Sequence, residues 1–382
     1  MAKYKNLIAA LGVSAMKSRH WAKVFDLLKE VPPASMDSMT LQQLLDMGAG
    51  NFINPIDDIS GAACGEEQIE KTLAGVIERW NENTFVVMPY RDFKDKFLIS
   101  EIDELIMKLE DDQMTVGTMM GSKFVTEVRE EVEEMEQKLK YIDIVIQEWL
   151  IFQQSWMYLE NIFSADDIRE QLKDETKLFN QVDKFWREHM LRCNKDPIVI
   201  NFVDSGTLRK KFEDNNKRLD EIKQKLEDYL TTKRAAFPRF FFLTNDELIQ
   251  ILSQTRNAQA VQPFLNKCFD SIKRIKFTED KNSKEIIAMN SPEGEVVDFY
   301  ESCFAHGPVE TWLNNIQQAM FVSLYMITRN AMEIYPEDGR QRDEWLFHCA
   351  AQCILVVDQV KWTNGIEAAI FEIMGGKNRS AL

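Results

Sequence analysis

The fold of this chain is decided by one long segment, FVTEVREEVEEMEQKLKYIDIVIQEWLIFQQSWMYLE, at residues 124–160. Alternating steps of three and four residues connect Val125, Val128, Val132, Met135, Leu139, Ile142, Ile146, Trp149, Gln153 and Trp156. Because all of these except Gln153 are apolar, the spacing predicts a single helix with a continuous apolar stripe. At about 1.5 Å per residue this helix is on the order of 50 Å long, which suits a strut in a bundle.

Helical patterns continue on both sides of the strut. Further helices are expected over residues 66–80, 101–109, 205–234 (closed by Pro238), 309–336 and 342–361. Four more helices are expected to begin at Thr40, at residues 164 and 176, and at Thr363. Residues 85–90 indicate an extended segment. The chain is therefore expected to be mainly α.

A β-rich insertion interrupts the helices between Ile272 and Phe299. Residues 285–289 and 296–299 favour strands, and the sequence Ser-Pro-Glu-Gly at 291–294 has the proline and glycine positions of a turn. The pattern predicts a small β-hairpin or meander at about 272–299. A hairpin of this size is marginal alone, so it is expected to lean on another part or to be a surface excursion.

The stretch RFFFLTNDEL at residues 239–248 joins an aromatic run to a helix start. Thr244 and Glu247 form a capping box, in which each side chain accepts a hydrogen bond from a backbone N–H of the first turn. By itself this indicates a buried strand or turn before a core helix.

Composition limits the possible functions. The 382 residues are 45% hydrophobic and 28% charged, which is typical of an ordered protein, and the formal net charge is −16. That charge counts against direct binding to nucleic acid, anionic membranes or the acidic surface of a microtubule. Six scattered cysteines without a secretory signal indicate reduced thiols, and no apolar run approaches the roughly 20 residues that cross a bilayer.

No catalytic, cofactor or metal motif is found. Gly375-Gly376-Lys377-Asn378 lacks the earlier glycine and the Ser or Thr of a phosphate-binding loop. His348, Cys349 and Cys353 lack the further ligands that a zinc site requires, so these thiols are expected to be core residues. We therefore expect no catalysis, no cofactor and no metal in this segment.

Several segments, taken in order, resemble the linker domain of dynein heavy chains. They are Arg19-His20-Trp21, Trp156 to Phe163, Arg239 to Pro263, Ser291 to Glu295, Val309 to Leu313, Trp345, and Gln359 to Thr363. The resemblance covers essentially the whole chain. The sequence of residues 239–263 is most similar to the axonemal heavy chains of cilia and flagella.

The resemblance implies an elongated, arched rod of packed helical bundles with a small inserted β-hairpin. Its expected parts are an N-terminal subdomain at 1–200 with the strut at 124–160, a central one at 201–305, and a third, incomplete one at 306–382. Such a rod lies across the AAA+ ring, where ATP and Mg are bound, and swings between bent and straight states to drive microtubule-based movement. Implied partners are that ring and, through a tail, other dynein subunits, with no direct microtubule contact.

Three sets of site residues follow from the resemblance. His20, Trp21, Val24 and Phe25 are expected to dock on the ring, the alternative being that Trp21 packs inside the first helical cluster. The hairpin is expected to touch the ring in the bent state, through Ile275, Phe277, Pro292, Glu293 and Gly294. His306, Gly307 and Pro308 are hinge candidates, because Gly307 has a free φ and Pro308 fixes a helix start; the alternative is an ordinary turn.

Two other classes of protein stay open on sequence alone. A spectrin-like or catenin-like helical scaffold would share the long helices and acidic charge, but would not predict the β insertion or the Phe240–Phe242 run. An unrecognised helical enzyme would show a concave pocket with perturbed ionisable groups.

Overall fold

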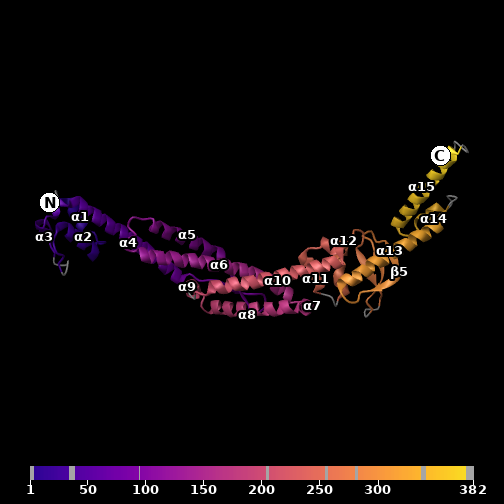
Figure 1. The fold of residues 1–382 in the computed structure, drawn as a ribbon, viewed down its shortest axis with the longest axis horizontal. Coiled ribbons are helices and arrows are strands. Elements are labelled where there is room, and N and C mark those ends of the chain that lie inside the picture. Colours follow the sequence, from indigo (N-terminus) through magenta and orange to yellow (C-terminus); the bar gives the residue numbers. More distant parts are fainter. Residues whose placement is uncertain are drawn as a thin grey trace. The chain divides into compact units, whose positions relative to one another are not determined.

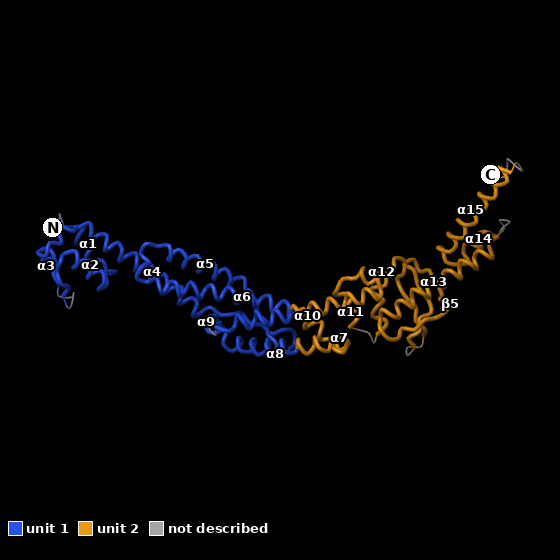
Figure 2. The backbone as a smooth tube through the Cα atoms, viewed as in Figure 1, with its two compact units in different colours: residues 1–156, 180–219 blue, residues 157–179, 220–382 orange. Residues whose placement is uncertain are grey.

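The computed structural model describes residues 4–33, 39–93, 95–203, 206–253, 257–279, 283–336 and 341–375. Of the residues used above for motifs and elements, 205, 254–256, 280–282 and 376–378 lie outside these ranges. The chain forms two compact units, residues 1–156 with 180–219 and residues 157–179 with 220–382 (Figure 2). The three-part division and the arched shape stay predictions.

Unit 1 is a helical bundle with one small β-hairpin (Figure 1). Its elements are α1 (Lys5–Leu11), α2 (Ser18–Leu28), α3 (Leu41–Asp46), η2 (Ala49–Asn51), α4 (Ile53–Glu82), β1 (Val86–Pro89), β2 (Phe97–Ser100), α5 (Ile102–Met120), α9 (Val199–Val203), and parts of α6 (Arg129–Phe163), α8 (Lys173–Lys195) and α10 (Leu208–Ala236). The extended segment at 85–90 is confirmed as β1, and its antiparallel partner β2 had not been predicted.

The predicted strut is confirmed as α6, which begins five residues later than expected because residues 122–128 form turns. Every apolar member of the stripe is buried. Gln153, its polar member, donates to the Ile99 carbonyl at 3.0 Å and accepts from the Ile99 N–H at 2.9 Å. The amide thus binds β2 to the helix as a strand partner would.

Stacked aromatic rings hold the helices of unit 1 together. The Trp186 ring of α8 lies 5.1 Å from Phe152 and 5.3 Å from Trp156 of α6, measured between centroids. Trp149 stacks at 5.0 Å on Phe202 of α9 and at 5.4 Å on Phe212 of α10. Such pairs add about 0.5–1.5 kcal/mol each to the free energy gained by burial.

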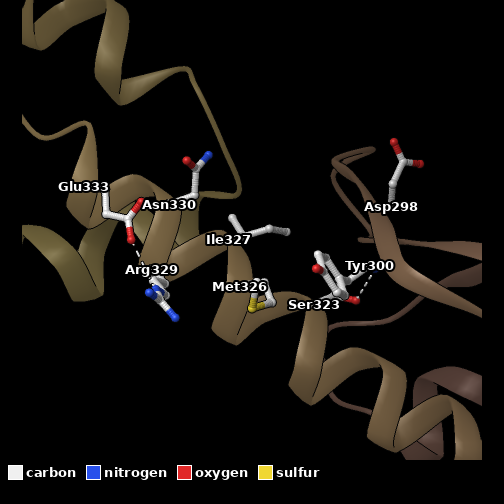
Figure 3. A pocket seen from close by; sticks show the side chains of 8 residues that line it. All are labelled: Asp298, Tyr300, Ser323, Met326, Ile327, Arg329, Asn330 and Glu333. Atoms are coloured by element: carbon white, nitrogen blue, oxygen red, sulfur yellow. Dashed lines mark hydrogen bonds and ion pairs between the residues drawn. The ribbon is translucent and has the colours of Figure 1, made fainter.

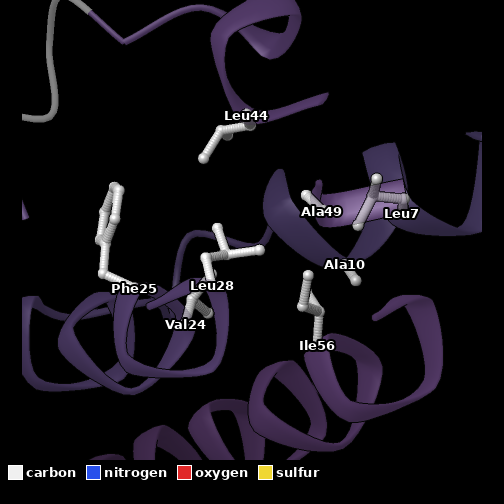
Figure 4. Packing of buried hydrophobic residues seen from close by; sticks show 8 residues of the cluster. All are labelled: Leu7, Ala10, Val24, Phe25, Leu28, Leu44, Ala49 and Ile56. Carbon is white, nitrogen blue, oxygen red and sulfur yellow. The ribbon is translucent and has the colours of Figure 1, made fainter. Parts of the chain in front are cut away.

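A second apolar cluster lies at the N-terminal part of unit 1 (Figure 4). It consists of Leu7, Ala10, Val24, Phe25, Leu28, Leu44, Ala49 and Ile56, contributed by α1, α2, α3, η2 and α4. The first two of these helices are separate, because α1 ends at Leu11 and α2 begins at Ser18. Ser60 of α4 donates to the Ala10 carbonyl at 2.9 Å and so fixes α1 on α4.

Gly65 allows a close approach between α4 and the segment before α6. A Cβ at this position would lie 2.3 Å from Cδ2 of Phe124 and 2.6 Å from its Cγ. We expect Gly65→Ala to lower the free energy of unfolding by about 1–3 kcal/mol, because the ring must move from its packed position. Denaturant unfolding measures this. Gly61→Ala on the same helix, with no atom within 4 Å of the new Cβ, should have no such cost.

Unit 2 combines helices with a three-stranded sheet (Figure 1). Besides its parts of α6, α8 and α10, it contains α7 (Asp166–Gln171), η3 (Pro238–Phe242), α11 (Asn245–Leu252), η4 (Ala258–Phe264), α12 (Leu265–Cys268), β3 (Arg274–Phe277), β4 (Glu285–Asn290), β5 (Val296–Phe304), α13 (Val309–Glu333), α14 (Arg342–Leu346) and α15 (Ala351–Met374). The capping box of α11 is present as predicted, with Thr244 Oγ accepting from the Glu247 N–H. The aromatic run is a 3₁₀ turn, in which Phe240 is buried while Phe241 and Phe242 are exposed.

The β insertion is confirmed as an antiparallel meander in the order β3-β4-β5. Ile275, Ile286, Ala288 and Met289 of β3 and β4 are buried. The third strand continues to Phe304, beyond the predicted limit, because an irregularity opposite residues 286–288 of β4 lengthens β5.

The C-terminal helices differ from the prediction. One helix had been expected over 342–361, with Thr363 beginning another. Instead α14 ends at Leu346, and Thr363 lies inside α15. The helical spacing of Trp345, Cys349 and Cys353 therefore spans a break.

Candidate functional site: docking, contact and hinge residues

The four expected docking residues lie on α2, and three of them face inward. His20, Val24 and Phe25 are at most 1% exposed, and Val24 and Phe25 belong to the N-terminal cluster. Trp21 is half-buried and packs against the edge of that cluster. Of the four side chains, Trp21 alone has surface to offer a partner.

His20 has a structural role that the sequence did not reveal. Its Nδ1 accepts from the Lys17 N–H at 3.0 Å, which completes a capping box at the start of α2. Since Nδ1 accepts, Nε2 carries the proton and donates to Glu66 of α4 at 2.8 Å. The ring thus caps one helix and binds it to another.

Charged side chains surround this histidine. Arg19 donates to Glu66 from Nε at 2.9 Å and from Nη2 at 2.6 Å, and to Glu70 at 3.1 Å. The hydrogen bond with Glu66 raises the pKa of Arg19, and the hydrogen bond from Lys17 lowers the pKa of Glu70. Arg19 therefore holds α2 on α4 through ion pairs, and His20 does so through its hydrogen bond to Glu66.

The hairpin candidates divide between core and surface. Ile275 is 3% exposed and Phe277 is half-buried, so neither lies on an arm that projects freely. Pro292, Glu293 and Gly294 are exposed in the turn between β4 and β5. The turn is where this set could meet a partner.

Gln262, near the end of the 239–263 stretch, binds the backbone of β3 with its side chain. Its side chain donates to the Ile275 carbonyl at 2.8 Å and accepts from the Ile275 N–H at 3.2 Å. The amide thus occupies the edge of β3, as Gln153 does for β2. Neither contact could be found by a local pattern, because each joins segments distant in the sequence.

The hinge candidates form an exposed turn between β5 and α13. Gly307 has φ +77°, a left-handed conformation that favours glycine, and Pro308 is the N-cap of α13. The His306 ring stacks on Phe304 at 5.8 Å.

Hydrogen bonds fix α13 beyond this turn. Lys233 contacts Glu310 at 2.6 Å, and Arg239 donates to Gln317 at 2.9 Å. On the sheet side, the Tyr300 N–H donates to Ser323 Oγ at 2.8 Å. A hinge motion here would have to break such bonds, whereas the alternative of an ordinary turn leaves them intact.

A groove lies between β5 and the second half of α13 (Figure 3). It encloses about 600 Å³ and is lined by Asp298, Tyr300, Ser323, Met326, Ile327, Arg329, Asn330 and Glu333. Arg329 pairs with Glu333 at 3.1 Å on the side of α13.

The last three helices of unit 2 expose many large apolar side chains, a surface that was not predicted from the sequence. Its residues are Phe321, Val322, Tyr325 and Met332 of α13, Leu346 of α14 with Phe347 after it, and Leu355, Val356, Val360, Trp362, Ile370, Phe371 and Met374 of α15. Phe347 is 90% exposed and Met374 is 80% exposed. The sequence does contain a signal for this surface. Apolar residues lie on all sides of α15, which is typical of a helix that other elements cover.

Metal and membrane sites are not seen in the described parts of the chain. No three His, Cys, Asp or Glu side chains gather there into a group that could hold a metal ion. Every helix described is too short or too polar to span a bilayer. Burial raises the pKa of the Cys193 thiol to about 12 and that of the Cys268 thiol to about 11, as for core cysteines.

His189 makes the stability of unit 1 depend on pH. Burial lowers its pKa, while Nδ1 donates to the Phe185 carbonyl at 2.8 Å. The unfolded chain takes up this proton near pH 6.5, whereas the folded chain does so only at lower pH. We therefore expect the free energy of unfolding to fall as pH drops below about 6.5. Urea unfolding of His189→Gln should show a flatter pH dependence between pH 6.5 and 5.5, and an equal slope would contradict the prediction; His348→Gln, at an exposed site, is the control.

Comparison with known proteins identifies the family. Residues 1–331 match the family model described as dynein heavy chain, N-terminal region 2. The chain is 38% identical over 365 residues to human dynein axonemal heavy chain 6, covering 91% of this chain and 9% of that protein. It is 38% identical over 360 residues to human dynein axonemal heavy chain 2, covering 94% and 8%, and 32% identical over 367 residues to rat dynein axonemal heavy chain 12, covering 96% and 12%.

The chain therefore spans at most 12% of the length of these three relatives. The match covers both units, and the relatives named are all axonemal. The chain belongs to the dynein heavy chain family, in which it corresponds to N-terminal region 2, and it is similar to the axonemal members.

Proposed function

We propose that this chain is the mechanical lever, or linker, of a dynein motor. It swings between bent and straight states and so converts ATP hydrolysis in the AAA+ ring of the same heavy chain into microtubule-based movement of a cilium or flagellum. Catalysis, ATP and Mg belong to the ring in this proposal. The family match supports the motor context, and the swing itself is the proposal's own step.

The observation that carries the proposal is the packing of long helices on aromatic side chains. In unit 1, α4 has 30 residues, and α6, α8 and α10 contribute parts of helices of 35, 23 and 29 residues. Trp149, Phe152, Trp156 and Trp186, each under 2% exposed, fill the space between them. Close-packed interiors have low compressibility and transmit strain, which a lever requires.

The contact with the motor parts is proposed to use the exposed apolar surface of α13–α15. Patches of this kind mark interaction sites on soluble proteins. Trp21 of α2 and the turn at Pro292 and Glu293 are proposed as additional, smaller contacts with the ring. His20, Val24 and Phe25 would support Trp21 from beneath rather than touch a partner.

The lever is tested in the full-length heavy chain by fluorescence transfer between a dye on this segment and one on the ring. The expected result is a change in transfer on addition of Mg-ATP and its reversal after hydrolysis. Equal transfer in all nucleotide states, in a motor that still hydrolyses ATP, would overturn the proposal.

The hinge at His306, Gly307 and Pro308 is tested in the same assay. We expect Gly307→Val to reduce the ATP-driven change in transfer, because a β-branched residue resists the φ changes that a hinge needs. Its strain at φ +77° would also cost about 1–3 kcal/mol of stability. Gly206→Val, at φ +58° with equally open surroundings, is the matched control for that strain. An unchanged response with Gly307→Val would favour the ordinary turn.

A further inference from the structure

The last helix of unit 2 begins without a cap of its own. The N-cap residue of α15 is Ala350, whose side chain has no acceptor, and the first turn contains no acidic residue. The first N–H groups of a helix need acceptors from outside it, and a negative charge near them is favourable. Glu295 meets both needs, because its Oε1 accepts from the Ala351 N–H at 2.9 Å.

The turn between β4 and β5 is built to present this carboxylate. The Ser291 N–H donates to the Glu295 carbonyl at 2.9 Å, and the Glu295 N–H donates to Ser291 Oγ at 3.2 Å. Gly294 has φ +97°, and its N–H donates to the Ser291 carbonyl at 3.2 Å. The backbone before Glu295 is thus fixed by its own hydrogen bonds, so the side chain is held by a rigid support.

The contact joins two parts of unit 2 with separate cores. On one side, the buried residues of β4 anchor the turn in the sheet. On the other, Ile354 and Val357 of α15 pack with Ala331 and Trp345. Since the carboxylate is exposed, water and salt compete for the bond, and it can open without unfolding either core.

We propose that the Ser291–Glu295 turn is a releasable latch, in which Glu295 caps α15 from the sheet and couples the position of the sheet to the order of the first turn of α15. When the latch opens, that turn loses its cap and frays, and the C-terminal helices are free to move relative to the sheet. The half-buried Cys349, one residue before the N-cap, is a natural reporter. Burial, Cys353 and the Glu295 charge together raise the pKa of its thiol.

The test compares Glu295→Ala, Glu295→Gln and the control Glu293→Ala in the 382-residue chain. Hydrogen exchange of the first turn of α15 should be about five-fold faster in Glu295→Ala, the size expected for loss of a helix cap. Glu295→Gln should be intermediate, because the amide oxygen still accepts a bond but lacks the charge. Alkylation of Cys349 by iodoacetamide should be faster as well, relative to the exposed Cys64.

Exchange of the β4 amides decides what a positive result means. Unchanged β4 exchange with faster α15 exchange supports the latch. Faster exchange in both would show that Glu295 supports the whole sheet, and it would overturn the proposal. Exchange in Glu295→Ala equal to that of Glu293→Ala would overturn it too, because the charge would then have no effect on α15. Neither result depends on whether the chain acts as a lever.

Discussion

Trp156→Ala is expected to lower the free energy of unfolding by about 3–5 kcal/mol, the loss typical of a large aromatic side chain removed from a core. The ring is fully buried, stacks on Trp186 at 5.3 Å and meets Tyr90 edge-on at 5.2 Å. Its Nε1 donates to Asp183 at 3.1 Å. The substitution therefore removes packing between α6, α8 and the β1–β2 hairpin at once. It also removes one donor of Asp183, which keeps its ion pair with Arg187.

Urea unfolding followed by circular dichroism measures the loss. Trp362→Ala is the matched control, because that ring is 69% exposed on α15 and its removal should change stability by no more than about 0.5 kcal/mol. Equal, small losses for both variants would show that the aromatic side chains between α6 and α8 do not carry the stability of unit 1. The proposed lever would then lose its stiff element.

The helices were predictable where the signal is local. The apolar stripe of α6 repeats without a slip, so its burial followed from spacing alone. The Thr244–Glu247 capping box is complete within four residues, and it marked the start of α11 correctly. The β insertion was visible because strands and a proline–glycine turn follow one another there.

Other features depend on partners far away in the sequence. Gln153 is a polar residue in an apolar stripe, and its reason for being there is the backbone of Ile99, 54 positions before it. Glu295 caps a helix 56 residues later. The break between α14 and α15 was missed because Trp345, Cys349 and Cys353 keep helical spacing across it.

The docking set shows how an amphipathic pattern can mislead. Trp21, Val24 and Phe25 were expected to dock on the ring, whereas the apolar stripe of a helix is most often the face that packs inside. In α2 that stripe meets α1, α3 and α4. Exposure separates Trp21 from the others, and exposure is set by the elements that pack around the helix.

Glu66→Ala should be the second large loss, about 2–4 kcal/mol, because it removes the acceptor that His20 and Arg19 share in a buried site. Glu66 is 5% exposed and His20 1% exposed, so neither group regains full hydration after the change. The expected loss of stability is smaller than for a fully buried ion pair, because Arg19 is about one-third exposed. Arg19 also keeps its ion pair with Glu70 at 3.1 Å.

A double-mutant cycle separates the clamp from simple truncation. Glu66→Ala and His20→Ala should together cost less than the sum of their separate losses, by roughly 1 kcal/mol or more, because each alone leaves the other unpaired. Glu67→Ala, which loses an exposed pair with Lys71, is the control and should cost no more than about 1 kcal/mol. Additive losses would mean that α2 is held on α4 by its apolar cluster alone. Trp21 would then be placed for docking by packing, with the charged neighbours in the motif serving only solubility.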